Sequence, residues 1–147
     1  MICALTGHRS LPKNFDKNRL YDELEEMIRK GYDHFLCGMA MGFDLLALEC
    51  LVDLKKKYRF MIEAYVPFEG QEQKFPPAAK LKYRELIAWC DVVRLLYQHF
   101  QDGCYIVRNR MMVDRADLLF AYCTQERGGT VFTVNYAKQK GVEIRYF

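Results

Sequence analysis

Long apolar runs, paired-cysteine motifs and low-complexity tracts are all missing from this sequence of 147 residues, and each absence excludes a class of protein. A membrane-spanning helix needs about 18 or more consecutive apolar residues, and no segment approaches that length. The six cysteines are scattered, with no C-x-x-C pair and no Cys/His pair at zinc spacing. We therefore expect neither a disulfide framework nor a metal site.

A strong charge of either sign is also absent. The formal net charge of +3 is too small to favour nucleic acid through bulk electrostatics. We therefore consider nucleic acid unlikely as a partner and expect a small molecule instead. The first apolar segment, residues 1–5, reaches the polar Thr6 too soon for the hydrophobic region of a signal peptide. The sequence predicts a cytoplasmic protein with no membrane insertion.

Apolar runs typical of buried strands alternate with helical patterns along the whole chain. Strands are expected over residues 2–5, 35–37, 59–66, 91–96, 118–122 and 142–146, and helices over 15–30, 43–56, 79–89, 104–115 and 130–140. Such alternation with short connections is typical of a mostly parallel sheet with helices on both faces. The sequence predicts one domain over residues 1–147, of the α/β class, with a Rossmann-like, doubly wound sheet.

Two glycine-bearing turns, at residues 37–44 and 128–130, each follow an apolar run and open a helical pattern. In a parallel sheet such turns lie at the carboxyl ends of strands, where backbone N–H groups and helix N-termini can hold phosphate. Neither turn matches the G-x-G-x-x-G fingerprint or a Walker loop with its lysine. Together they predict a nucleotide-like ligand without specifying a reaction.

Polar residues with ligand-binding chemistry occupy two further places. In the turn after the first strand, Gly7 permits close backbone approach, His8 can donate or titrate near neutral pH, and Arg9 offers a planar fork for phosphate. Arg108 and Asn109 follow the loop over residues 97–103, so we expect them at the ligand end of their helix.

Two carboxylates complete the candidate site. Asp44 has two interpretations that stay open, because it can cap its helix or accept hydroxyls from a ribose. Glu69 lies in a long irregular loop over residues 66–78, and such loops are often functional. We expect no cofactor, and the catalytic residues are unknown, with Glu69 and Asp44 as candidates. The expected ligand-binding residues are Thr6, Gly7, His8, Arg9, Gly38, Gly42, Asp44, Glu69, Arg108, Asn109, Gly128, Gly129 and Thr130.

The order of these motifs resembles the YpsA family of the SLOG superfamily of Rossmann-like proteins. The resemblance covers essentially the whole chain and rests on residues 6–9, 38–44, 67–72, 108–114 and 128–130. It implies a small cytosolic sensor or regulator of a nucleotide-derived ligand, such as a nucleotide, a nucleotide sugar, or an ADP-ribose-like or NAD-related compound. In Firmicutes the family is linked to cell division.

Two wider relatives suggest other functions. Residues 40–44 are similar to the ARGID-like turn of DprA/Smf, which binds single-stranded DNA. Residues 128–130 are similar to the GGxGTxxE motif of the LOG (lysine-decarboxylase-like) phosphoribohydrolases, which cut the N-glycosidic bond of nucleoside monophosphates. Aligning the final Gly-Thr of that motif puts Thr133 where its catalytic glutamate belongs, and a hydroxyl cannot replace a carboxylate as general base.

Three hypotheses follow, in this order: a nucleotide-ligand binding module, a nucleoside-phosphate or NAD-type glycosidic hydrolase using Glu69 or Asp44, and a DprA-like binder of single-stranded DNA. A homodimer is also expected. Tyr97, Phe100 and Tyr105 fall outside the expected core, and exposed aromatic surface often marks an interface.

Overall fold

A single sheet of six strands organises the protein, whose computed structural model describes all 147 residues. The strand order is β4-β3-β2-β1-β5-β6, and every neighbouring pair is parallel. The strands are β1 (Ile2–Gly7), β2 (His34–Cys37), β3 (Met61–Phe68), β4 (Val92–Tyr97), β5 (Leu118–Tyr122) and β6 (Glu143–Tyr146). The predicted Rossmann-like α/β fold is confirmed.

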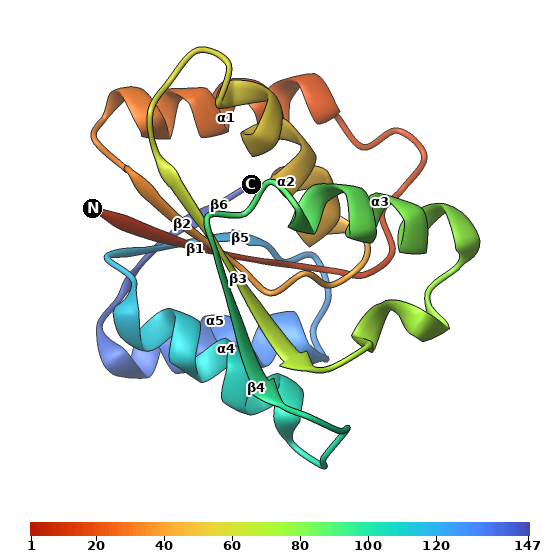
Figure 1. Cartoon of the computed structure of the whole chain (residues 1–147). Coiled ribbons are helices and arrows are strands. Elements are labelled where there is room, and N and C mark those ends of the chain that lie inside the picture. Colours follow the sequence, from red (N-terminus) through yellow and green to blue (C-terminus); the bar gives the residue numbers. More distant parts are fainter.

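Helices cover both faces of the sheet (Figure 1). On one face lie α1 (Lys17–Arg29), α2 (Phe43–Leu54) and α3 (Pro77–Ile87), and on the other lie α4 (Cys104–Arg115) and α5 (Gly129–Lys140). The chain adds strands outward from β1 to β4 and then returns to place β5 on the free side of β1. Because parallel crossovers are right-handed, this reversal of direction moves the later helices to the opposite face. None of these helices has the length and apolarity needed to cross a bilayer.

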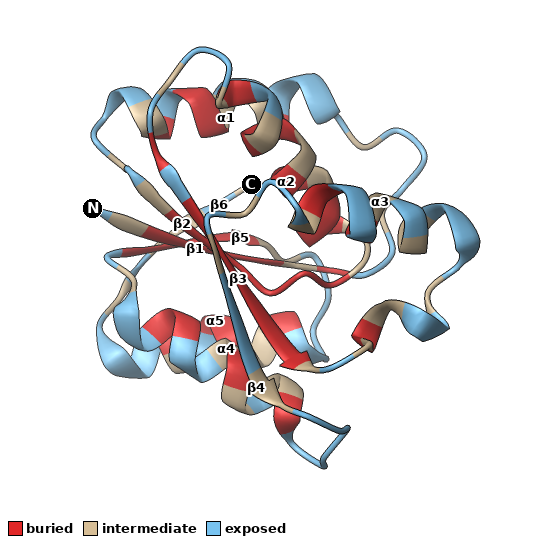
Figure 2. Cartoon of the chain, in the orientation of Figure 1, coloured by how far each residue is buried: buried red, intermediate tan, exposed pale blue.

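The central strands are buried on both sides, which explains why they read as continuous apolar runs (Figure 2). Adjacent residues on a strand point to opposite faces. Phe35 therefore packs in the larger core cluster, which includes Leu48 of α2, and Leu36 packs in the smaller one, which includes Met112 of α4. The two clusters hold the helical layers against one rigid sheet.

The segment after β3 departs from the predicted irregular loop. β3 continues through Phe68, and the residues beyond it include a 3-10 turn, η1 (Gln71–Lys74). β2 ends at Cys37 opposite Ala64, so Pro67 lies where β3 has only β4 as a neighbour. Proline has no N–H to donate, and a strand position with one free side tolerates that missing donor. The strand therefore runs further than its sequence suggests.

An ionic cluster around the buried Glu63 fastens α4 to the sheet. The carboxylate of Glu63 on β3 accepts hydrogen bonds from Arg115 of α4 and Arg94 of β4, and Arg115 also donates to the hydroxyl of Tyr65. Burial raises the pKa of Glu63, and the hydrogen bonds from the two arginines outweigh it, so the pKa lies below its ordinary value. The ionised form of Glu63 thus stabilises the folded state.

Replacing Arg115 with methionine should lower the free energy of unfolding at pH 7 by about 2–3 kcal/mol, because a buried carboxylate loses its better partner. Arg94→Met is the matched control and should cost less, since Arg94 is more exposed and its hydrogen bond is 3.4 Å long. Urea denaturation followed by circular dichroism measures both. The losses should shrink as pH falls through the ordinary glutamate value of 4.5 and below. Equal losses for the two variants at pH 7 would contradict this account.

Candidate functional site

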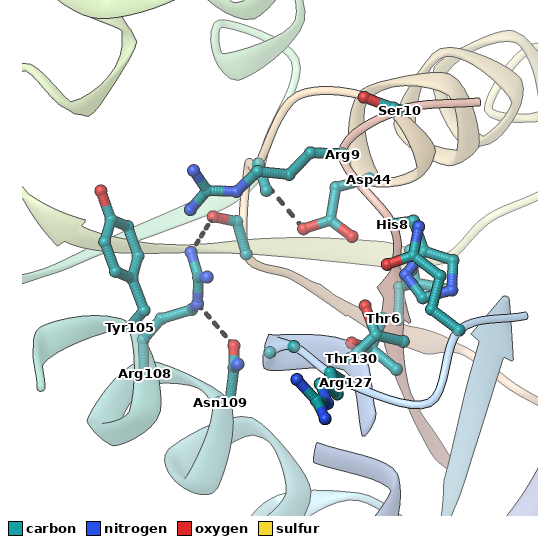
Figure 3. A pocket seen from close by; sticks show the side chains of 17 residues that line it. Thr6, His8, Arg9, Ser10, Asp44, Tyr105, Arg108, Asn109, Arg127 and Thr130 are labelled. Atoms are coloured by element: carbon teal, nitrogen blue, oxygen red, sulfur yellow. Dashed lines mark hydrogen bonds between the residues drawn. The ribbon is translucent and has the colours of Figure 1, made fainter. Parts of the chain in front are cut away.

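A cavity of about 410 Å³ lies at the carboxyl ends of β1 and β5 (Figure 3). The connection after β1 leads to α1 on one face of the sheet, and the connection after β5 leads to α5 on the other. Ligands of open α/β sheets bind in the crevice that opens where two neighbouring connections diverge in this way. The volume falls within the range of about 300–1,000 Å³ that is usual for ligand pockets.

All but two of the predicted ligand-binding residues line this cavity. The structure brings together Thr6, Gly7, His8, Arg9, Gly38, Asp44, Arg108, Asn109, Gly128, Gly129 and Thr130. Four segments distant in sequence therefore meet at one place. The remaining lining residues, which were not among the expected ligand-binding residues, are Leu5, Ser10, Ala40, Tyr105, Gln125 and Arg127.

Glu69 lies elsewhere, so the expectation that it shares this cavity is wrong. It is exposed and lines a separate hollow with Tyr83 and Arg84. The longer β3 carries it past the end of the sheet, where its N–H donates to the carbonyl oxygen of Tyr97 at 3.1 Å. Glu69 therefore cannot supply a carboxylate to a ligand in the cavity.

Gly42 supports the cavity from behind instead of lining it. Its φ of +81° is a conformation that favours glycine, and an added Cβ would lie 2.3 Å from the carbonyl oxygen of Arg9. The next residue, Phe43, donates its N–H to the carbonyl oxygen of His8 at 3.0 Å. Gly7 has a similar role, because its Cβ would lie 2.3 Å from the Phe43 ring. These glycines let α2 begin directly against the turn after β1.

The guanidinium of Arg108 is buried in the wall of the cavity. Its Nη1 donates to the carbonyl oxygen of Gly38 at 2.5 Å, and its Nε donates to Oδ1 of Asn109 at 2.8 Å (Figure 3). A Cβ on Gly38 would lie 2.9 Å from Cζ of Arg108, so a larger residue there would displace the guanidinium. Burial lowers the pKa of Arg108, and the nearby Asp44 opposes that effect. Arginine carries five N–H donors, so the protein leaves several of them for a ligand.

A second arginine shares the same wall. Cζ of Arg9 lies 4.9 Å from the centroid of the Tyr105 ring, and Cζ of Arg108 lies 5.6 Å from it (Figure 3). Both guanidinium groups are within the range of a cation–π contact. Two positive charges on one ring favour an anion between or beside them. Tyr105 precedes Arg108 by three residues on α4, which is the helical spacing that makes the two side chains neighbours.

Asp44 has an unusual environment for a carboxylate. It is 5 % exposed; its Oδ2 accepts the N–H of Ala40 at 3.2 Å, and its Oδ1 has no hydrogen-bond partner. Burial raises the pKa of Asp44 to about 6, while Arg108, the Ala40 amide and Arg9 act in the opposite direction. Of the two interpretations of this residue, helix capping does not occur, because Gly42 occupies the N-cap. Its role as an acceptor for a ligand hydroxyl stays a prediction.

The N-terminus of α5 forms the opposite wall. Gly128, with φ of +114°, is its N-cap, and the N–H groups of Gly129 and Thr130 make no backbone hydrogen bond. A helix N-terminus carries a partial positive charge and unpaired N–H donors, which suit an anion. The exposed Arg127 adds a full positive charge beside them.

Two residues at this wall have structural hydrogen bonds. Nε2 of His8 accepts the N–H of Thr124 at 2.8 Å, and burial lowers the pKa of His8, so the imidazole is neutral at pH 7 and braces the loop after β5. The Thr133 hydroxyl donates to the carbonyl oxygen of Gly129 at 2.8 Å. Thr133 thus stabilises the first turn of α5 and brings no carboxylate to the cavity.

The fold and this cavity define a Rossmann-like α/β protein. Its polar, positively charged cavity lies between β1 and β5, where the order of strand addition reverses. The model of the YspA SLOG family (YpsA) matches residues 13–147, so the chain belongs to this family. The family expected from the motifs is confirmed. A UPF0398 protein of Oceanobacillus iheyensis is 26% identical over 141 residues, which cover 88% of this chain and 77% of the relative.

Two solved structures share the fold. DNA processing protein A (DprA) from Streptococcus pneumoniae matches with a TM-score of 0.69 at 15% identity, over 98% of this chain and 49% of that one. DprA from Helicobacter pylori, described by its single-stranded DNA binding mode, matches with a TM-score of 0.67 at 16% identity, over 99% and 64%. This chain therefore spans about half of the first protein and under two thirds of the second.

From the sequence we considered nucleic acid unlikely as a partner. That expectation rested on the net charge of +3 for the whole chain. The cavity concentrates Arg9, Arg108 and Arg127 against a single carboxylate, Asp44. Total charge was thus a poor guide to the local charge, and nucleic acid stays among the candidates.

Asp44 should make folding depend on pH in the opposite sense to an ordinary paired carboxylate. Its folded-state pKa of about 6 lies above its ordinary value of 3.8. Ionisation of Asp44 therefore lowers the free energy of unfolding as pH rises from 4 to 7, by about 2–3 kcal/mol at about 1.4 kcal/mol per pKa unit.

Asp44→Asn resembles the protonated side chain and removes this effect. Its stability relative to the native protein should rise by a similar amount between pH 4 and pH 7, measured by urea denaturation at each pH. Glu69→Gln, at an exposed carboxylate outside the cavity, is the control. A constant difference between Asp44→Asn and the native protein across this range would refute the raised pKa.

Proposed function

We propose that this protein binds a phosphate-bearing, nucleotide-derived ligand in the cavity and acts as a cytosolic sensor or regulator. The observation that carries the proposal is the presence in one cavity of two complementary unsatisfied groups. One is the free N-terminus of α5, and the other is the buried, unpartnered Oδ1 of Asp44. The first attracts an anion, and the second accepts a hydrogen bond from a neutral donor.

These two groups give the ligand an orientation. A phosphate fits the N–H groups of Gly129 and Thr130, where the helix dipole and Arg127 add favourable charge. The same phosphate is repelled by the ionised Asp44, so the part of the ligand beside Asp44 must be a donor such as a sugar hydroxyl. Arg9 and Arg108 are available for further phosphate oxygens. A sugar phosphate with vicinal hydroxyls satisfies all of these requirements.

Binding without turnover is the preferred form of the proposal. Asp44 is the only carboxylate among the residues that line the cavity, whereas glycosidic hydrolysis commonly uses a pair. Thr133 occupies the position of the catalytic glutamate in the LOG motif, and Glu69 lies outside the cavity. A glycosidic hydrolase that relies on Asp44 remains the alternative.

A second candidate function is the binding of single-stranded DNA. The fold shared with DprA supports it, as does the convergence of three arginines with the aromatic ring of Tyr105. Single-stranded nucleic acid is held by positively charged grooves with aromatic platforms. An oligothymidylate that binds more tightly than adenosine 5′-monophosphate (AMP), with a steep salt dependence, would favour this function over the first.

Gly129→Val should abolish phosphate binding while leaving the fold intact. Gly129 does not have positive φ, and no atom lies within 4 Å of an added Cβ, so the valine projects into open space over the phosphate position. We expect AMP affinity to fall by more than about tenfold, the equivalent of about 1.4 kcal/mol. Asn135→Val, on an exposed turn of the same helix, is the control. Isothermal titration calorimetry with AMP and a thermal melt measure both effects, and undiminished binding by Gly129→Val would exclude this phosphate site.

Asp44→Asn should remove the contribution of the ribose hydroxyls. The native protein should bind AMP at least about tenfold more tightly than 2′,3′-dideoxy-AMP, since a hydrogen bond to a charged acceptor contributes about 1.5–3 kcal/mol. This ratio should fall toward one in Asp44→Asn and stay unchanged in Glu69→Gln. If the native protein steadily releases free adenine, and Asp44→Asn binds AMP without releasing it, the hydrolase alternative replaces the binding proposal.

A further inference from the structure

The cavity offers little to an aromatic base. A nucleobase needs a flat apolar surface on at least one face, and the lining is largely polar. Leu5 and Ala40 are buried at the base of the cavity, and the ring of Tyr105 carries the guanidinium groups of Arg9 and Arg108. If the ligand of the proposed function is a nucleotide, its base must lie outside the cavity.

An exposed aromatic ring stands next to the cavity. Phe100 lies in the loop between β4 and α4, which projects beyond the sheet at the carboxyl end of β4 (Figure 1). Phe100 is 57% exposed, and its ring is nearly perpendicular to the ring of Phe68, with the two ring centroids 5.4 Å apart. It also packs against Tyr105, which lines the cavity, with the two ring centroids 6.2 Å apart. Phe100 is thus held in place by two other rings while much of its own surface faces solvent.

Self-association is the other explanation for an exposed aromatic residue, and it stays a prediction. Of the three aromatic residues expected outside the core, only Phe100 is exposed, whereas Tyr97 and Tyr105 are partly buried. Other apolar residues such as Trp89 and Val93 are also exposed, so the experiment below measures the oligomeric state as well as the affinity. One exposed ring offers a surface on which one nucleobase can stack.

We propose that Phe100 is a stacking platform for the nucleobase of a ligand whose phosphate and sugar occupy the cavity. This inference rests on the proposed function and adds the part of the ligand that the cavity does not accommodate. The ring contacts Tyr105, a residue of the cavity wall, so the platform lies next to the cavity. Stacking uses the π-face that every base has. Phe100 therefore selects for an aromatic base and does not distinguish adenine from guanine.

The test compares two probes that share a phosphate and a ribose and differ in the base. AMP should bind the native protein about tenfold more tightly than ribose 5-phosphate, which is within the range measured for stacking of one base on an aromatic side chain. In Phe100→Ala the affinity for AMP should fall to near that for ribose 5-phosphate, whose own affinity should not change. Phe100→Tyr keeps the platform and should bind AMP as the native protein does.

Trp89→Ala is the matched control, because Trp89 is 61% exposed and lines a different hollow of the surface. It should leave both affinities unchanged. The platform is excluded if AMP and ribose 5-phosphate bind the native protein equally, or if Phe100→Ala weakens the binding of both alike. It is also excluded if sedimentation shows that the native protein is a dimer and that Phe100→Ala loses AMP affinity only because the dimer dissociates. If neither ribose 5-phosphate nor AMP binds, the proposed function itself fails and the platform falls with it.

Discussion

The buried guanidinium of Arg108 connects the parts of the cavity that come from opposite faces of the sheet. Arg108 belongs to α4 on one face, and its hydrogen bond to the carbonyl oxygen of Gly38 reaches the loop that leads into α2 on the other. It also faces Asp44 and contacts the ring of Tyr105. The Arg115–Glu63 cluster fastens α4 to β3, so Arg108 is carried by a helix that is anchored to the sheet.

The same arrangement leaves the cavity electrostatically incomplete. Three arginines and a helix N-terminus meet one carboxylate, and that carboxylate keeps an unpartnered buried oxygen. Buried polar atoms in proteins nearly always have partners, and strongly shifted pKa values concentrate at functional sites. Gly42 contributes to this site because its backbone lies close to the carbonyl oxygen of Arg9. This close approach brings the start of α2, and with it Asp44, up to the turn after β1. A ligand with an anionic end and a hydroxyl-bearing end would neutralise the excess positive charge and give the buried oxygen of Asp44 a hydrogen-bond donor.

Much of this organisation could be predicted from local patterns. The apolar runs identified the strands, and the glycine turns identified the carboxyl-end loops, because their signals lie within a few residues. Glu69 was misplaced because the end of β3 depends on where β2 stops, which is a tertiary fact. Tyr105 and Arg127 were missed because an aromatic residue on a helix and an exposed arginine carry no motif. Net charge did not indicate the local concentration of arginines in the cavity, because it averages over the surface.

The most direct test of the central claim is a crystal structure of the protein with AMP. The account predicts that the phosphate accepts hydrogen bonds from the N–H groups of Gly129 and Thr130, and that a ribose hydroxyl donates to Oδ1 of Asp44. Phosphate bound only by exposed side chains, away from the N-terminus of α5, would contradict it. So would a ribose turned away from Asp44, which would leave the buried oxygen unpartnered in the complex as it is in the free protein.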